Sequence, residues 1–334
     1  MKNTKIYIIA EIGINHNGNM RIAKKLIRDA KIAGASAVKF QVFQPETIAR
    51  GDMKKTKDQK KFVNKNITLK KLLKRVYLNM SQLKQLKLLT KKEKMDFICS
   101  IFDKTSLNKV MKVGVDYIKI ASSDINDIFL LKLVKRTKKN VILSTGMAGN
   151  KDISNALKIL GQKISLLHCV SSYPCSIKLA NLNRILNLKN KFKVKIGYSD
   201  HTVGTDACKI AIMLGAKVIE KHFTYNKRAK GFDHILSADK NDLADIAYFA
   251  NNYKKYLGSG KILPSQLEFK NRKYFRKGVY FSRDLKKDHL IKIGDIAFLR
   301  PENSIDITKY KTVLEKTLKR NVIKYEGVEK KLIK

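Results

Sequence analysis

Short apolar runs alternate with longer amphipathic stretches along most of the chain. The apolar runs predict eight strands, at 5–10, 36–41, 96–101, 116–120, 140–144, 164–168, 194–198 and 216–221. The stretches between them predict helices at 21–33, 81–94, 104–112, 126–137, 151–160, 178–189 and 204–214, with a last helix at 239–256. Eight strands alternating with helices indicate an α/β fold with a parallel (β/α)8 TIM barrel, and a doubly wound open sheet is the alternative.

Two segments depart from this rhythm. Residues 42–75 are lysine-rich and weakly periodic, and they predict a long loop of the kind that often forms a lid or binding loop. The polar stretch 258–271 predicts a linker. Short strand-like pieces punctuated by glycine and proline follow it, and they predict a small, mostly β domain. We therefore expect a barrel over 1–257, a linker over 258–271 and a small domain over 272–334.

The composition is typical of a folded protein in a reducing compartment. Of the 334 residues, 44% are hydrophobic, which is enough for a large core. No apolar run approaches the roughly 18 residues of a membrane span, and the N-terminus lacks the cleavage site of a signal peptide. The cysteines are Cys99, Cys169, Cys175 and Cys208, and none stands in a CxxC pair. We expect a cytoplasmic protein without a membrane partner.

The formal net charge of +43 is extreme. A charge of this sign can indicate a nucleic-acid-binding protein, and that class is one alternative function. Lysines, however, run from end to end, without a basic tail or a basic stripe with interleaved aromatic residues. The pattern therefore favours a lysine-biased surface without a nucleic-acid partner. Part of the charge can steer anionic substrates toward the protein.

Polar residues gather where nearly every predicted strand ends. In a (β/α)8 barrel the active site lies at these carboxyl ends. The residues are Glu11, Asn15, His16, Asn17, Lys39, Gln41, Ser100, Lys119, Ser122, Ser123, Ser144, Thr145, His168, Ser171, Ser172, Tyr173, Ser199, Asp200, His201, Thr202, Glu220, Lys221, His222, Asp233 and His234. Their convergence predicts a site, and the lysines among them suit an anionic substrate.

Two histidines indicate a metal. His201 and His222 end neighbouring strands, which lie about 4.8 Å apart, and both imidazoles can therefore reach one ion. Glu11 and Asp233 are available as further ligands or as partners of the ligands.

Three lysines can project from strands into the barrel mouth, namely Lys39, Lys119 and Lys221. Two such inward cations near Ser122, Ser144, Thr145 and Gly146 would form a cradle for a phosphate and a carboxylate. A Schiff-base pyruvate aldolase that uses Lys119 is the alternative enzyme. Side chains alternate between the two faces of a strand, and a lysine on the other face would instead cover a helix.

At these residues the sequence resembles the sialic acid synthase family, which includes legionaminic and pseudaminic acid synthases. The matching stretches are AEIGINHNG at 10–18, VKFQ at 38–41, KIAS at 119–122, LSTGM at 143–147, HCVSSYP at 168–174, GYSDHT at 197–202, EKHFT at 220–224 and the Asp233-His234 pair. The C-terminal part resembles the antifreeze-like (SAF) domain of that family through 282–295 and Arg300-Pro301. The resemblance runs over nearly the whole chain.

The resemblance implies a transferase that condenses phosphoenolpyruvate with an open-chain N-acylated amino sugar, such as N-acetylmannosamine or a diacetylated analogue. Phosphate leaves by C–O cleavage. By resemblance, the divalent metal, Mn²⁺ or Mg²⁺, is held by His201 and His222. Phosphoenolpyruvate is bound by Lys39, Lys119, Ser122, Ser144, Ser171 and Tyr173, whereas Glu11, Gln41 and Asp233 lie near the sugar and the reacting centre. Arg300 reaches the sugar site of a neighbouring subunit, which implies a domain-swapped homodimer.

Three positions depart from the family pattern. Ile101-Phe102 follow Ser100 where Thr-Pro is usual, Phe232 replaces a proline, and a serine at 171 or 172 replaces an asparagine. The first two bear on the sugar's identity. The Asp233-His234 pair and Tyr198 resemble sialic and legionaminic acid synthases more than pseudaminic ones. A sugar-binding relative without activity is a further alternative, against which Lys39, His201 and His222 argue.

Overall fold

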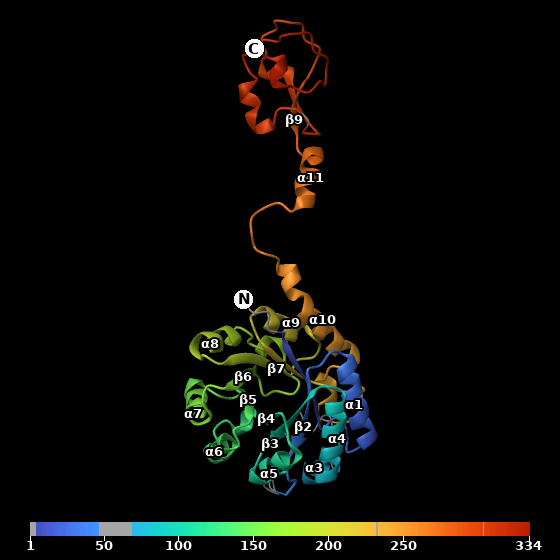
Figure 1. Cartoon of the computed structure of the whole chain (residues 1–334), viewed down its shortest axis with the longest axis vertical. Helices are drawn as coiled ribbons and strands as arrows, with labels where there is room; N and C mark the ends of the chain where they lie inside the picture. The colour runs from blue at the N-terminus through green and yellow to red at the C-terminus, as the bar shows by residue number, and fades with distance from the viewer. Residues whose placement is uncertain (1–4, 47–68, 232, 303) are drawn as a thin grey trace. The chain divides into compact units, whose positions relative to one another are not determined.

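The computed structural model describes residues 5–46, 69–231, 233–302 and 304–334. The chain divides into two compact units, Met1–Gly258 and Ser259–Lys334. In the first unit, eight strands pair in parallel and in sequence order, and the eighth closes onto the first (Figure 1). The predicted (β/α)8 barrel is confirmed, and the open doubly wound sheet is excluded.

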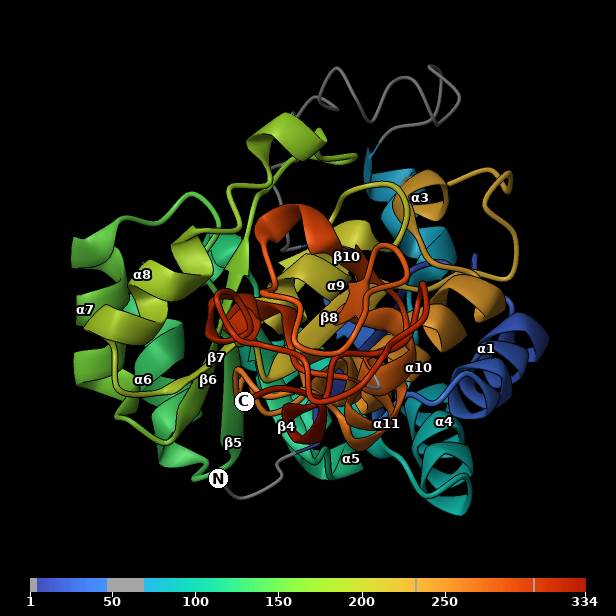
Figure 2. The same cartoon turned by 90° about the horizontal axis from the view of Figure 1, so that it is seen from above.

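Each predicted strand is present, with ends that shift by a few residues. The strands are β1 (Tyr7–Gly13), β2 (Ala37–Val42), β3 (Asp96–Ile101), β4 (Tyr117–Ile120), β5 (Asn140–Ser144), β6 (Ile164–Cys169), β7 (Lys195–Asp200) and β8 (Val218–His222). The helices of this unit are α1 (Met20–Ile32), α3 (Leu69–Val76), α4 (Met80–Lys92), α5 (Lys104–Val113), α6 (Ile128–Arg136), α7 (Asn150–Leu160), α8 (Arg184–Lys191), α9 (Asp206–Met213) and α10 (Lys240–Leu257). Figure 2 shows α6, α7 and α8 along one flank and α1 beside α4 along another.

The strands are buried on both faces, because one face packs on the helices and the other lines the barrel. Inside the barrel, the floor is apolar and is made by Ile9, Ala37, Ile98, Ile142, Leu167 and Val218. The residues between them in the strands, such as Ile8 and Val38, belong to the larger core that the helices cover. Since the apolar floor fills the middle of the barrel, polar side chains are left to the carboxyl ends of the strands.

Local capping explains where the helices begin and end. Asp103 starts α5 by accepting a hydrogen bond from the Ser106 amide at 2.6 Å, and Gly114, with φ of 81°, ends it. The helix predicted at 178–189 is instead a 3₁₀ turn, Ile177–Leu179, followed by α8. Asn181, with φ of 45°, separates the two, because a left-handed residue breaks a helix.

Two segments predicted as irregular contain helices. The expected loop over 42–75 ends in α3, and residues 47–68 lie outside the described part of the chain. The expected linker over 258–271 contains the start of α11 (Gln266–Phe275). The segment was predicted as a linker because its composition is polar. The helix begins with a capping box, in which Ser265 Oγ accepts from the Glu268 amide at 3.2 Å and the Glu268 carboxylate accepts from the Ser265 amide at 2.7 Å.

The second unit has a small core around an antiparallel pair of strands, β9 (Gly278–Phe281) and β10 (Ile296–Leu299). Isolated bridges extend the pairing, as between Leu285 and Val322. Phe281 and Val328 are fully buried in its core. The unit is therefore small and contains an antiparallel pair of strands.

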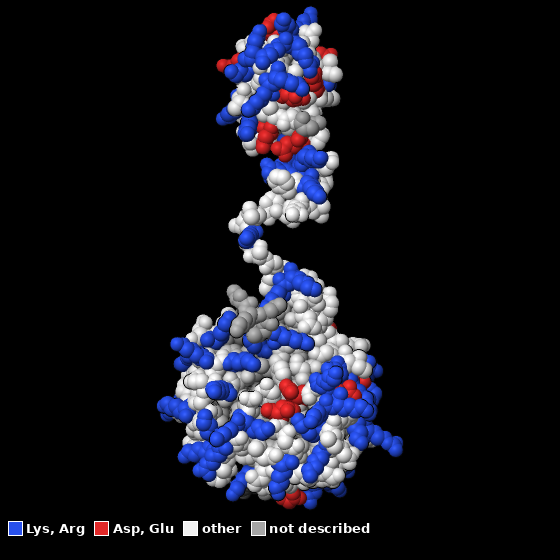
Figure 3. Space-filling view, in the orientation of Figure 1, with Lys and Arg blue, Asp and Glu red and all other residues white. Residues whose placement is uncertain are grey.

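Lysine and arginine side chains are spread around the visible face of both units, as Figure 3 shows, and are not gathered in one patch. This distribution agrees with a lysine-biased surface. Within the described residues, no helix is both long and apolar enough to cross a membrane.

Candidate active site

Strand alternation places a ring of polar side chains directly above the apolar floor of the barrel. Glu11, for example, is two residues beyond Ile9, and Ser144 is two residues beyond Ile142, and side chains two residues apart point to the same side of a strand. The ring consists of Glu11, Lys39, Ser100, Lys119, Ser144, Cys169, Ser199 and Glu220. All eight strands therefore contribute one side chain each to this polar ring, which forms the bottom of a single cavity.

This cavity has a volume of about 490 Å³ and opens at the carboxyl ends of the strands. Its wall adds side chains from the strand ends and from the segments that follow them. They are Ile14, Gln41, Leu73, Phe102, Ala121, Ser122, Ser123, Ser171, Ser172, Tyr173, His201, His222 and Asp233. A volume of this size suits a small-molecule substrate pair.

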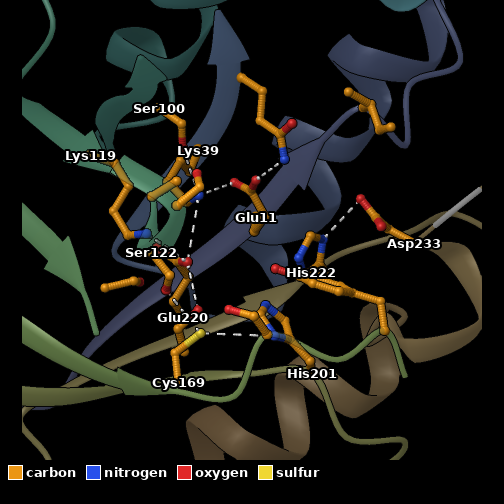
Figure 4. A pocket seen from close by; sticks show the side chains of 18 of the residues that line it. Glu11, Lys39, Ser100, Lys119, Ser122, Cys169, His201, Glu220, His222 and Asp233 are labelled. Atoms are coloured by element: carbon orange, nitrogen blue, oxygen red, sulfur yellow. Dashed lines mark hydrogen bonds and ion pairs between the residues drawn. The ribbon is translucent and has the colours of Figure 1, made fainter. Parts of the chain in front are cut away.

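Two lysines and two glutamates of the polar ring alternate across the bottom of the cavity (Figure 4). Lys39 Nζ lies 2.9 Å from Glu11 Oε2 and 3.5 Å from Glu220 Oε1, and Lys119 Nζ lies 3.6 Å from the same Glu220 oxygen. Ser199 donates to Glu220 at 2.9 Å, and Gln41 donates to Glu11 at 3.0 Å. All four charged groups are nearly inaccessible to solvent, and their interactions are therefore little screened.

The surroundings push the pKa values of the two glutamates apart. Burial raises the pKa of Glu11, and the nearby Glu220 adds to the rise, although Lys39 opposes it. Burial acts on Glu220 in the same direction, but Lys119 and Lys39 outweigh it and lower the pKa of Glu220. Two carboxyl groups with separated pKa values are suited to different proton-transfer roles.

His201 and His222 face the same cavity from neighbouring strand ends, with ring centroids 5.4 Å apart. His201 Nδ1 donates to the Val170 carbonyl at 2.7 Å, which leaves Nε2 with a free lone pair. His222 Nδ1 is buried without a hydrogen-bond partner, and the nearest acidic oxygen, on Asp233, is 3.6 Å away. Burial lowers the pKa of His222 well below its ordinary value and keeps the ring neutral.

The donor set suits a metal whose coordination is completed by other molecules. Neutral imidazoles are good ligands, and an orphaned buried nitrogen is costly unless something binds it. Burial raises the pKa of Asp233 to about 6. Its Oδ2 lies 3.6 Å from His222 Nδ1, which is too far for a hydrogen bond to that nitrogen. No three or more His, Cys, Asp and Glu side chains in the described chain converge on one point, so water or substrate would supply the remaining ligands.

A cluster of hydroxyl groups lies beside Lys119. Ser122 Oγ accepts from the Gly146 amide at 2.9 Å, whereas Ser144 Oγ and Ser171 Oγ are buried without hydrogen-bond partners. A Cβ atom on Gly146 would lie 2.4 Å from Ser171 Oγ and 2.8 Å from Ser122 Oγ. The absence of a side chain at Gly146 thus keeps open the space in which these hydroxyls can meet a ligand.

The structure brings eleven of the twelve predicted site residues to this cavity, which are Glu11, Lys39, Gln41, Lys119, Ser122, Ser144, Ser171, Tyr173, His201, His222 and Asp233. The twelfth, Arg300, follows β10 in the second unit, and its approach to a partner's site stays a prediction. Phe232 lies outside the described residues.

Lys221 is a correction to the predicted set of inward lysines. It points to the helix side of the barrel, where its Nζ lies 2.7 Å from Asp200 Oδ2, because it alternates with the inward residues Glu220 and His222. The prediction assigned no role to Glu220 and Cys169. Glu220 stands two residues beyond Val218 and Cys169 two residues beyond Leu167, and both of these apolar residues face the inside of the barrel. This spacing could have identified them from the sequence.

Known proteins share this architecture and sequence. A sequence model of the NeuB family matches residues 26–262. An N,N'-diacetyllegionaminic acid synthase of Campylobacter jejuni is 36% identical over 95% of this chain and 97% of its own length. A pseudaminic acid synthase of the same species is 30% identical over 95% of this chain and 94% of its own length.

A crystal structure agrees with these matches. It is that of the N-acetylneuraminic acid (sialic acid) synthetase of Leptospira borgpetersenii serovar Hardjo-bovis in complex with citrate, and its TM-score to this chain is 0.70. The two are 35% identical, and the similarity covers 80% of this chain and 90% of that one. Because the family match spans most of the barrel and these relatives align with nearly all of the chain, this protein belongs to the NeuB family.

Proposed function

We propose that this protein is a nonulosonic acid synthase that joins phosphoenolpyruvate to an N-acylated amino sugar. Carbon C3 of phosphoenolpyruvate forms a bond to the aldehyde carbon of the open-chain sugar, whose oxygen takes up a proton. Water adds to C2, and phosphate leaves by cleavage of its bond to C2. The similarity to a legionaminic acid synthase, a pseudaminic acid synthase and a sialic acid synthetase supports this reaction class.

One observation carries the proposal. Two buried serine hydroxyls without partners, on Ser144 and Ser171, lie in the same cavity as Lys39 and Lys119. Unpaired buried donors beside two lysines favour an anion with several acceptor oxygens, which would satisfy all of them at once. Phosphoenolpyruvate, with one phosphate and one carboxylate, has this chemistry. Ser122 and Tyr173 complete the wall on this side.

Glu11 is the group best suited to manage the proton of the sugar oxygen. Its raised pKa brings it nearer to neutral pH, where a carboxyl can both give and accept a proton. Gln41 donates to one of its oxygens at 3.0 Å and so holds the carboxyl in place. Glu220, whose pKa is lowered, stays ionised, and its Oε1 lies 3.5 Å from Lys39 Nζ and 3.6 Å from Lys119 Nζ, where it favours the charged form of both lysines. Asp233 lies beside the histidines, where a sugar hydroxyl can reach it.

His201 and His222 would hold a divalent metal, Mn²⁺ or Mg²⁺, through His201 Nε2 and the orphaned His222 nitrogen. When bound, such an ion orients and polarises a carbonyl group. Arg300 would reach the sugar from a partner subunit in a domain-swapped homodimer. The reaction uses small water-soluble metabolites, which suits a cytoplasmic enzyme.

The test is phosphate release from phosphoenolpyruvate in the presence of Mn²⁺, with N-acetylmannosamine and with 2,4-diacetamido-2,4,6-trideoxymannose as acceptors. We expect release that requires a sugar and that stops on addition of EDTA. No release with either sugar from a folded sample would refute the proposal.

The aldolase alternative deserves its own experiment, because burial lowers the pKa of Lys119 and a neutral amine can form a Schiff base. Borohydride treatment in the presence of pyruvate would attach pyruvate covalently to Lys119 in an aldolase. For a synthase we expect no mass increase, and a Lys119→Met variant provides the matched blank.

A further inference from the structure

Three of the polar residues that gather at the strand ends do not line the cavity, namely Asn15, Asn17 and His234. The two asparagines follow β1, and His234 directly follows Asp233. Asn15 and His234 are fully buried, and a buried polar side chain needs partners. Both asparagines direct their hydrogen bonds to residues of the segment 223–239.

The segment 223–239 connects β8 to α10 and carries Asp233. It is longer than most connections in a (β/α)8 barrel, and a connection of this length needs ties to the barrel if Asp233 is to keep one position. Because β8 pairs with β1, the residues that follow β1 lie within reach of it. Figure 4 shows the result of this packing, in which the Asp233 carboxylate points toward His222.

The first tie is a hydrogen-bond chain that passes through the ring of His234. Burial lowers the pKa of His234 to about 4, so the ring is neutral, with one donor nitrogen and one acceptor nitrogen. Thr224 Oγ1 donates to the Asn226 carbonyl at 3.1 Å and therefore accepts from His234 Nδ1 at 2.7 Å. His234 Nε2 then accepts from Asn17 Nδ2 at 3.2 Å. The ring thus connects the residues after β1 with those after β8.

The second tie starts at Asn15 and holds the backbone of Asp233. Asn15 Nδ2 donates to the Phe223 carbonyl at 3.0 Å and to Ser237 Oγ at 2.9 Å. Ser237 Oγ in turn donates to the Asp233 carbonyl at 2.6 Å. The main chain of Asp233 and the ring of the next residue are therefore both fixed from the segment after β1.

We propose that Asn17 and His234 are positioning residues that hold the Asp233 carboxylate beside His222. The inference rests on the proposed function, in which a sugar hydroxyl reaches Asp233. Neither positioning residue lines the cavity, so each acts through Asp233. Displacing a reacting or orienting group by about 1 Å can cost about 100-fold, and we expect loss of this tie to lower kcat/KM for the sugar by about 10-fold to 100-fold. The KM for phosphoenolpyruvate should not change, because the hydroxyl cluster beside Lys119 is held by other loops.

Two variants of His234 separate its two hydrogen bonds. A glutamine amide takes the place of Nε2 and keeps the bond to Asn17, whereas an asparagine amide takes the place of Nδ1 and loses that bond. Phosphate release is measured with N-acetylmannosamine and with 2,4-diacetamido-2,4,6-trideoxymannose, as for the wild type. We expect His234→Gln to retain most of the kcat/KM for the sugar and His234→Asn to lose about 10-fold to 100-fold.

Asn17→Gly removes the other partner of this bond. Asn17 has a φ of 50°, a left-handed conformation that glycine adopts without strain. Asn181→Gly is the matched control, because Asn181 is also exposed, has a φ of 45° and does not line the cavity. Asn17→Gly should lose as much kcat/KM for the sugar as His234→Asn, and Asn181→Gly should match the wild type.

A double variant tests whether the effect passes through Asp233. In an Asp233→Asn background, Asn17→Gly should cause no further loss, because residues that act through one group are not additive. The same further loss in both backgrounds would overturn the inference, as would equal rates for the two His234 variants or a parallel rise in the KM for phosphoenolpyruvate. The His234 pair decides alone where Asp233→Asn leaves no measurable rate. These outcomes leave the synthase assignment standing, whereas no phosphate release by the wild type with either sugar would overturn the function and the inference with it.

Discussion

Replacing Lys221 by methionine should destabilise the barrel strongly, although the lysine does not face the cavity. Its Nζ lies 2.7 Å from Asp200 Oδ2, and both side chains are completely buried. The methionine would leave the Asp200 carboxylate with only uncharged donors, among them Tyr198 at 2.9 Å and the Thr202 amide at 2.8 Å. A buried charge that loses its partner typically costs about 3–5 kcal/mol.

In a unit of this size, each kcal/mol shifts the melting temperature by about 2–4 °C, and Lys221→Met should therefore lower it by about 6–20 °C. Thermal unfolding followed by far-ultraviolet circular dichroism measures the shift. Lys209→Met is the matched control, since Lys209 pairs with Asp245 at 2.6 Å with side chains 27% and 46% exposed. Exposed pairs contribute at most about 1 kcal/mol, so this control should melt within about 4 °C of the wild type.

Equal melting temperatures for the two variants would refute the view that Asp200 carries a buried charge that Lys221 neutralises. A double variant, Asp200→Asn with Lys221→Met, should recover part of the loss, because it removes both charges together. The pair matters to the site as well as to the fold. Asp200 and Lys221 directly precede His201 and His222, so they fasten the two strand ends that present the imidazoles.

Three other predictions concern the site and the pH dependence of the fold. His222→Ala should lower metal-dependent phosphate release at least about 100-fold without changing the circular dichroism spectrum, and undiminished turnover would contradict its role as a ligand. Arg300→Ala should raise the KM for the sugar more than that for phosphoenolpyruvate, and an unchanged sugar KM would count against its reach into a partner's site. His16 is buried, and burial lowers its pKa from 6.5 to about 4. The unfolded chain therefore takes up a proton at a higher pH than the folded protein does, and the fold loses stability as the pH falls from 6.5 toward 4. The loss is on the order of 3 kcal/mol. His16→Gln should flatten the decline of unfolding free energy over this range in urea titrations, and an equal decline in both proteins would show that other groups cause it.

The sequence was sufficient for the barrel because strands that are buried on both faces stand out as apolar runs between amphipathic helices. The sequence was less informative about whether each polar side chain faces the inside of the barrel or the surrounding helices. Lys221 and Glu220 are neighbours at the end of one strand, and only the register with the strand before it decides which one reaches the cavity. Register depends on contacts between strands that are distant in sequence, and a single strand does not reveal it.

Short helices in polar segments were missed for a different reason. The helix α11 has no buried residue, so it lacks the apolar stripe from which helices are predicted. Its Ser265-Glu268 capping box was visible in the sequence, but such boxes are weak signals without the stripe. The apolar part of the cavity lining also needed the structure, because Ile14, Leu73 and Phe102 are far apart in sequence and line one cavity only when β1, β2 and β3 lie side by side.

The absence of a side chain at Gly146 affects how the sequences of related proteins can be interpreted. A single added methyl group would drive Ser171 and Ser122 away from each other, and because both can rotate, the barrel itself would survive the change. The substitution is therefore expected to affect the chemistry of the site more than the fold. Gly146→Ala would be a well-folded, inactive version of the protein for binding studies. In a chain with the same barrel and a larger residue here, we expect the hydroxyls of Ser122 and Ser171 to be displaced and the proposed reaction to be lost.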